Sequence, residues 1–140
     1  MAKLVLANLK KSTLLTQKLN YLNTLRYLLF TAVTGGAPSG PSVIGDFVLV
    51  SDAGHNPAGR PPQFGTAVLN AAFQAESNGQ PITWTFEYTN NTPFTILGYC
   101  VIDPLDGKLV YSQMAPAAVT ITGPQQTYTV VPKMLDDTMP

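Results

Sequence analysis

The sequence predicts an all-β protein built from antiparallel strands, and two observations support this prediction. Apolar and polar residues alternate without interruption over Ile82–Thr89 (ITWTFEYT), and alternation returns near the C-terminus. A period of two is typical of a strand with one buried and one wet face. Alternating stretches follow one another at spacings of about 8–12 residues with turn signals between them, which is typical of an antiparallel sandwich or barrel.

The first part of the chain has a different pattern. Lys3–Leu9 (KLVLANL) indicates an extended apolar arm. Three leucines then recur at helical spacing after a Ser-Thr pair that can cap a helix: Leu15, Leu19 and Leu22. The predicted helix has about three turns, and a helix this short needs a surface to pack on.

Strands and loops alternate through the middle of the chain. Thr24–Val33 is rich in aromatic and β-branched residues and predicts a strand, as does Val43–Val50. Two stretches dense in Gly and Pro, Thr34–Ser42 and Asp52–Pro62, predict loops. The Ala-rich segment Gly65–Phe73 fits either a strand or a helix.

Strand signals are strongest from Ile82 onward. Gly98 interrupts one apolar run and predicts a bulge or a close contact. After Ile82–Thr89, we predict strands over Phe94–Asp103, Lys108–Met114, Ala118–Gly123 and Thr127–Pro132. The predicted organisation is an N-terminal arm and short helix over residues 1–23, followed by a β-sandwich domain over residues 24–140.

The composition is unusually poor in charge. Charged residues make up 11% of the 140 residues, against about 25% in ordinary soluble domains. A surface of Thr, Ser, Asn and Gln repels its neighbours weakly, which suits a protein that works in an assembly. The net charge is zero, so we expect neither nucleic acid nor membrane as a partner. The first 45 residues nevertheless carry only cationic charges, which fits either a solvated basic segment or an arm that docks on an acidic surface.

Asp103 and Asp106 are the first candidates for a catalytic or metal site. They stand in DPLDG, where Pro104 sets φ for a turn, Asp106 can cap the backbone and Gly107 can take positive φ. A hairpin tip is exposed, whereas acid–base catalysis needs burial or a close like charge. A calcium loop needs further oxygen ligands at fixed spacing. We therefore interpret the two aspartates as a hairpin turn.

The other candidate residues also give no support for a catalytic or metal site. His55 is the sole histidine and has no neighbouring His or Cys with which to bind zinc, although the sequence leaves a Ser–His–acid site open. The single Cys100 lies in an apolar run and predicts a buried, inert thiol. Trp84 is expected in the core, while tyrosines could pack there or stack on a sugar. We expect no enzymatic activity, no cofactor, no metal ion and no membrane span.

The second half of the chain resembles the head-decoration, or capsid cement, proteins of tailed bacteriophages. The resemblance covers residues 82–135, where a Thr-alternating strand, a hairpin and further alternating strands follow in that order. The N-terminal arm followed by a strand is similar in layout, whereas the Gly- and Pro-rich middle departs from the pattern. The matching residues are Gly98, Tyr99, Val101, Asp103, Gly107, Leu109, Val110, Tyr111, Thr127, Val130 and Pro132.

The resemblance implies a jelly-roll-like β-sandwich without catalytic activity on the outer capsid surface of a virion. Its partners would be the major capsid protein and sister subunits in a homotrimer or homodimer. The hypothesis for the interface is that apolar and basic residues of the arm contact the shell or a sister subunit: Lys3, Leu4, Leu6, Leu9, Lys10 and Lys11. The alternatives are a receptor- or carbohydrate-binding β module of a virion fibre or tail, another virion part, and a small hydrolase that uses His55.

Overall fold

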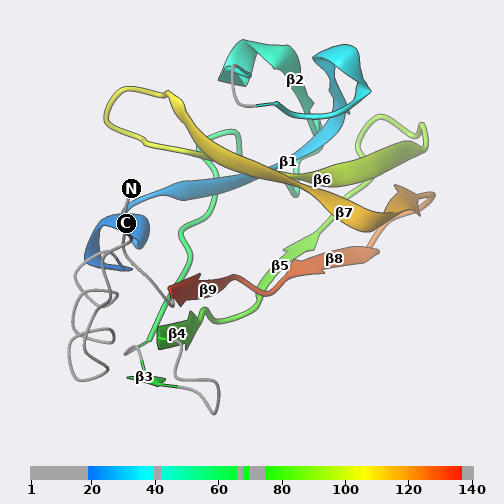
Figure 1. Cartoon of the computed structure of the whole chain (residues 1–140). Helices are drawn as coiled ribbons and strands as arrows, with labels where there is room; N and C mark the ends of the chain where they lie inside the picture. The colour runs from blue at the N-terminus through cyan, green and yellow to red at the C-terminus, as the bar shows by residue number, and fades with distance from the viewer. Residues whose placement is uncertain (1–18, 40–41, 66–67, 70–74, 137–140) are drawn as a thin grey trace. The chain divides into compact units, whose positions relative to one another are not determined.

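The computed structural model describes residues 19–39, 42–65, 68–69 and 75–136 (Figure 1). Strands dominate these residues, and the described strand registers are all antiparallel, which confirms the predicted all-β class. The chain forms two compact units. The larger one contains residues 25–61 and 83–129, and the smaller one takes its described residues from 1–24, 62–82 and 130–140.

The larger unit is built on a four-stranded sheet in the order β2-β1-β6-β7. Its strands are β1 (Arg26–Val33), β2 (Phe47–Leu49), β6 (Phe94–Ile102) and β7 (Leu109–Ile121). The central strands β1 and β6 lie side by side, so that β2 and β7 form the two edges (Figure 1). The predicted strands at the positions of β1 and β6 are therefore confirmed.

Strand β7 corrects one prediction. The sequence predicts two separate strands, Lys108–Met114 and Ala118–Gly123, but the structure contains one strand of 13 residues. Residues 115–118 form a wide bulge opposite a single residue of β6. Pro116 fits there because a bulge on an edge strand does not require its missing N–H. The polar and apolar pattern is interrupted at the bulge although the strand direction continues.

Gly98 lies next to this bulge. The register of β6 against β7 shifts between Ile96 and Gly98. A Cβ atom at Gly98 would come within 2.2 Å of the backbone oxygen of Gln113. The prediction of a bulge or a close contact at this glycine is confirmed in both respects.

Alternate residues of the sheet face opposite sides, and both sides are buried. On one side Leu28, Phe30 and Cys100 form a core cluster with Val33 and Phe47. On the other side Tyr27, Leu29 and Val101 are buried. The chain before β2 packs through Ile44 on the core cluster, and it forms two short 3-10 turns, η1 (Thr34–Gly36) and η2 (Ile44–Asp46).

The predicted strand Val43–Val50 is too long because η2 occupies its first half. The Asp46 carboxylate accepts a hydrogen bond from the N–H of Val43 at 2.9 Å, which closes a turn there. Only Phe47–Leu49 remains in a strand.

Strands β5 (Ile82–Thr85) and β8 (Thr127–Val130) pair in a two-stranded sheet. Trp84 and Phe86 are buried while the threonines between and beside them are exposed, so the predicted alternation is confirmed. The strand nevertheless ends at Thr85, earlier than predicted. Tyr88 has a φ of 58°, which interrupts an extended chain.

The smaller unit holds a three-stranded sheet in the order β3-β4-β9. Its strands are β3 (Val68–Leu69), β4 (Ala75–Asn78) and β9 (Lys133–Asp136). Residues 19–22 are helical, and Leu19 and Leu22 are buried. They form the end of the predicted helix, whose earlier turns and preceding arm lie outside the described residues. The division between residues 23 and 24 stays a prediction.

Candidate functional site

The two aspartates of DPLDG form a turn, as predicted. Asp103 accepts a hydrogen bond from the N–H of Leu105 at 3.0 Å, and Asp106 accepts one from the N–H of Lys108 at 2.9 Å. Gly107 has a φ of 71° and donates its N–H to the carbonyl oxygen of Asp103 at 2.7 Å. Both carboxylates therefore stabilise the tip of the β6–β7 hairpin.

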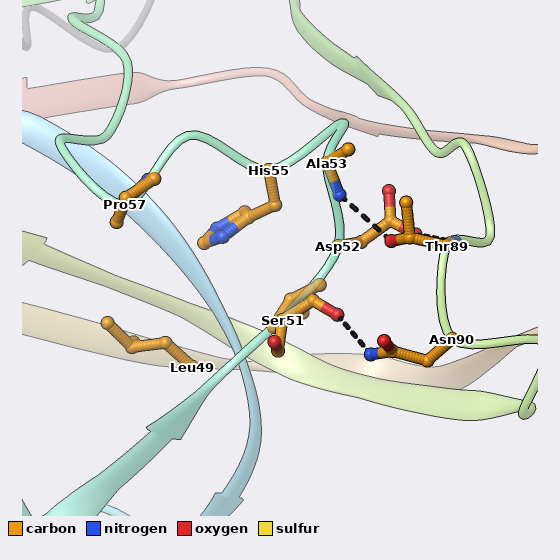
Figure 2. A pocket seen from close by; sticks show the side chains of 9 residues that line it. Leu49, Ser51, Asp52, Ala53, His55, Pro57, Thr89 and Asn90 are labelled. Atoms are coloured by element: carbon orange, nitrogen blue, oxygen red, sulfur yellow. Dashed lines mark hydrogen bonds between the residues drawn. The ribbon is translucent and has the colours of Figure 1, made fainter.

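The pocket beside His55 is the second candidate (Figure 2). It has a volume of about 500 Å³, and its lining brings together the residue types of a Ser–His–acid site. The lining residues are Leu49, Val50, Ser51, Asp52, Ala53, His55, Pro57, Thr89 and Asn90. The hydrogen bonds of these side chains decide whether the pocket can use that chemistry.

His55 serves as a structural acceptor. Its side chain is only 3% exposed, and its Nε2 accepts a hydrogen bond from the N–H of Leu29 at 2.9 Å. A neutral imidazole has one acceptor nitrogen, so the proton is on Nδ1. The ring stacks on Trp84 with centroids 6.4 Å apart. Burial lowers the pKa of His55 more than the Val50 backbone and the Asp52 charge raise it.

Asp52, the acid of this pocket, accepts hydrogen bonds with both of its carboxylate oxygens. Asp52 Oδ2 accepts hydrogen bonds from the N–H groups of Gly54 at 2.8 Å and Glu87 at 2.9 Å. Its Oδ1 accepts from the N–H of Thr89 at 3.1 Å and from its hydroxyl at 3.3 Å. Burial works to raise the pKa of Asp52, but these donors together outweigh burial and lower it.

Ser51, Asp52 and His55 thus share a pocket without forming a catalytic relay. Within the described part of the chain, no hydrogen bond joins the Ser51 hydroxyl to His55. The only acceptor nitrogen of His55 could take a proton only by giving up the bond from Leu29. The hydrogen bonds of Asp52 instead connect the loop after β2 to the segment after β5.

Further hydrogen bonds connect the same two segments. The Asn90 amide donates to the carbonyl oxygen of Ser51 at 3.0 Å, and the Thr89 hydroxyl accepts from the N–H of Ala53 at 3.2 Å (Figure 2). A Cβ atom at Gly54 would lie 2.0 Å from the carbonyl oxygen of Thr85, so only glycine fits there. Asp52 is not among the site residues predicted from the sequence. Its local signal is an Asp two residues before a Gly in a loop, which favours a turn closed by the carboxylate.

The tyrosines divide between core and surface. Tyr27 is buried and stacks on Tyr99 with ring centroids 5.1 Å apart, while Tyr111 meets both rings edge-on. The hydroxyls of Tyr27 and Tyr111 are hydrogen-bonded. Burial raises the pKa of Tyr27 far above its ordinary value and that of Tyr99 to about 12. Trp84 is in the core, as predicted.

The thiol of Cys100 is buried in the core cluster, as predicted. Burial raises its pKa to about 12. A thiol that is protonated and inaccessible does not act as a nucleophile. Among the residues that the structure describes, there is also no cluster of three or more His, Cys, Asp or Glu side chains placed to hold a metal ion.

The edge of the larger sheet is the third candidate, and we call Leu109–Ile121 the β7 edge. Strand β7 pairs with β6 on one side, and no described strand pairs with its other side. The chain from Leu109 to Pro132 contains no Asp, Glu, Lys, Arg or His. Val110 and Val119 are 39% and 38% exposed. This surface was not predicted from the sequence, where its only signal is the long uncharged run.

A hollow of about 380 Å³ lies beside the start of the β7 edge. Its lining residues are Pro38, Ser39, Ser42, Leu109, Val110, Tyr111 and Ser112. The hollow is adjacent to the core cluster, against which Leu109 and Met114 pack while remaining half-buried. Apolar contact area is therefore left uncovered at this edge.

The interface residues predicted on the arm lie outside the described residues: Lys3, Leu4, Leu6, Leu9, Lys10 and Lys11. Comparison with known proteins found no matching family model, no matching curated protein and no matching solved structure. None of the helical segments described has the length and apolar character required to cross a membrane.

Proposed function

We propose that this chain is a structural virion protein that binds the outer surface of an icosahedral phage capsid and cements neighbouring capsid subunits. In this proposal the larger unit is a jelly-roll-like sandwich without catalytic activity, and the protein acts as a homo-oligomer. The observation that carries the proposal is the β7 edge, a 13-residue uncharged strand with one unpaired side.

An edge of this kind supports a role in adhesion. Unpaired N–H and C=O groups on an edge strand form a template for another chain, and soluble proteins commonly protect such edges with charged side chains. The β7 edge has no charged side chain of its own. The sequence resemblance over residues 82–135 includes this strand and also favours a capsid-binding role.

The arm is the second contact in the proposal. Leu4, Leu6 and Leu9 would bury apolar area against the shell or a sister subunit, at about 25 cal/mol per Å² before the costs of association. Lys3, Lys10 and Lys11 would meet acidic capsid groups and steer docking. Many copies on one shell would then stabilise it together.

The test is to mix the purified chain with the empty shell assembled from the capsid protein of the same virus, and to measure co-sedimentation. We expect the chain to pellet with the shell. Deleting residues 1–11 should reduce occupancy, and unchanged occupancy would rule the arm out. A chain that stays in the supernatant at every concentration tested would contradict the proposed function.

A pair of lysine variants addresses the β7 edge in the same assay. Val110→Lys places a charge on the first part of the edge, whereas Thr127→Lys places one on an exposed position of β8. We expect the first variant to reduce occupancy and the second to leave it near the wild-type value. Equal effects of the two variants would argue against the edge.

A second candidate function is a receptor- or carbohydrate-binding module of a virion fibre or tail. Tyr99 and Tyr111 are half-buried, and the Tyr99 hydroxyl donates to the exposed Gln113 amide oxygen at 2.7 Å. Aromatic rings beside an amide can contact both the apolar and the polar parts of a sugar. Binding on a glycan array that Gln113→Ala abolishes would favour this candidate over cement.

A further inference from the structure

The first part of the β7 edge can pair with another strand. Leu109–Met114 precede the bulge at residues 115–118, and within them the register against β6 shifts once, because Tyr111 lies opposite Val101 but Leu109 lies opposite Ile102. Leu109 and Val110 therefore form a small bulge. Tyr111–Met114 pair regularly, and a strand in a globular protein has about 3–10 residues. Pro116 and the bulge prevent regular pairing beyond Met114, since a proline has no N–H to donate. Any added strand is therefore confined to this first part.

The faces of β7 follow from its register against β6. Tyr111 and Gln113 lie opposite Val101 and Tyr99, so they share one face. Ser112 lies opposite Cys100, and it shares the other face with Met114, which packs on the core cluster. An added strand must respect this alternation, because directly opposite residues point to the same side of a sheet.

We propose that the occupant of this edge is β7 of a second copy of the chain, paired antiparallel about a two-fold axis at Ser112. This register places Tyr111 opposite Gln113 of the partner subunit and Ser112 opposite its own counterpart, so each pair shares a face. An isologous contact requires a surface that is complementary to itself. The β7 edge has no charges that would repel their copies, so electrostatics do not oppose such pairing.

The hollow beside the edge fits the same register. With the axis at Ser112, Met114 of the partner subunit lies opposite the small bulge of Leu109 and Val110, and both of these residues line the hollow of about 380 Å³. Methionine is unbranched and flexible, so it can fill an irregular space of this kind. Leu109, which also lines the hollow and is half-buried in the single chain, would be covered.

This inference deepens the proposed function by assigning the contact between sister subunits, and it rests on that proposal for the biological role of the dimer. The contact itself requires no shell. It is therefore tested on the purified full-length chain, and its failure is distinguishable from a failure to bind capsids.

The first experiment is a symmetric disulfide. Opposite Cβ atoms in an antiparallel pair are about 4.5–5.5 Å apart, near the separation that a disulfide needs. We expect Ser112→Cys to form a covalent dimer under mild oxidation. Thr127→Cys, on an exposed position of β8, is the matched control, and native Cys100 is too buried to take part. Equal crosslinking by the two variants, or none, would overturn the pairing.

The second experiment is a charge exchange at the axis, read by analytical ultracentrifugation. Ser112→Lys and Ser112→Asp each place like charges opposite one another, so each alone should dimerise about tenfold or more weakly than wild type. A mixture of the two should recover a dimer. Wild type that stays monomeric up to about 1 mM, or a mixture no more dimeric than either variant, would overturn the proposal.

Discussion

Replacement of His55 by phenylalanine tests the buried hydrogen bond between the N–H of Leu29 and the His55 side chain. The variant keeps an aromatic ring beside Trp84 but removes Nε2, the acceptor for the N–H of Leu29. Leu29 is 0% exposed, so water cannot replace this acceptor. A buried donor without a partner costs about 1–3 kcal/mol. The variant also removes the buried Nδ1 of His55, which lacks a well-formed hydrogen bond in wild type, so we expect a net cost near the lower end, about 1 kcal/mol. A loss of this size lowers the melting temperature by about 3–5 °C in a chain of this size.

The same variant also changes the pH dependence of stability. Burial lowers the pKa of His55 in the folded state, so the neutral ring stabilises the fold fully above the unfolded value of 6.5. This contribution is lost as the pH falls below 6.5, by at most about 1.4 kcal/mol per pH unit. His55 is the only histidine in the chain, so it is the one side chain with an ordinary pKa in this window.

The assay is urea unfolding at pH 7.5 and pH 5.5. We expect wild type to lose stability at the lower pH, and His55→Phe to be less stable at pH 7.5 but nearly insensitive to this change. His55→Gln is the matched control, because its amide oxygen can accept a hydrogen bond without titrating. A variant that retains both the wild-type stability and the wild-type pH dependence would refute this reasoning.

Three further predictions concern the same unit. Gly98→Ala should cost about 1–3 kcal/mol because its Cβ would meet Gln113, whereas Gly123→Ala, in open space, should be nearly neutral in thermal unfolding. Asp52→Asn should lower the free energy of unfolding by about 1.5–3 kcal/mol at pH 7. This difference from wild type should shrink as the pH falls below the unfolded pKa of 3.8, because wild-type Asp52 then becomes protonated. A difference in the free energy of unfolding that stays constant down to pH 2 would contradict this prediction. Cys100 should react with a thiol reagent only after urea unfolds the protein, and rapid reaction in buffer would show that its burial is wrong.

The sequence could predict what local chemistry determines. Alternation identified the face of β5 that buries Trp84, and the DPLDG residues identified the β6–β7 turn with Gly107 at positive φ. Gly98 was predicted at a close contact because a glycine inside an apolar run has few other reasons to be there.

The remainder depends on residues far apart in the chain. The donors to Asp52 include Glu87 and Thr89, more than thirty residues away, and no local pattern indicates them. The acceptor role of His55 is set by Leu29 on β1. The continuity of β7 was missed because a bulge interrupts the alternation without ending the strand.

The most direct test of the proposed function is an electron-microscopy map of the virus particle that carries this protein. We expect density for the larger unit on the outside of the icosahedral shell, with copies joined through Leu109–Met114. Absence of the protein from the particle, or its location only in the tail, would show that the proposed function is wrong.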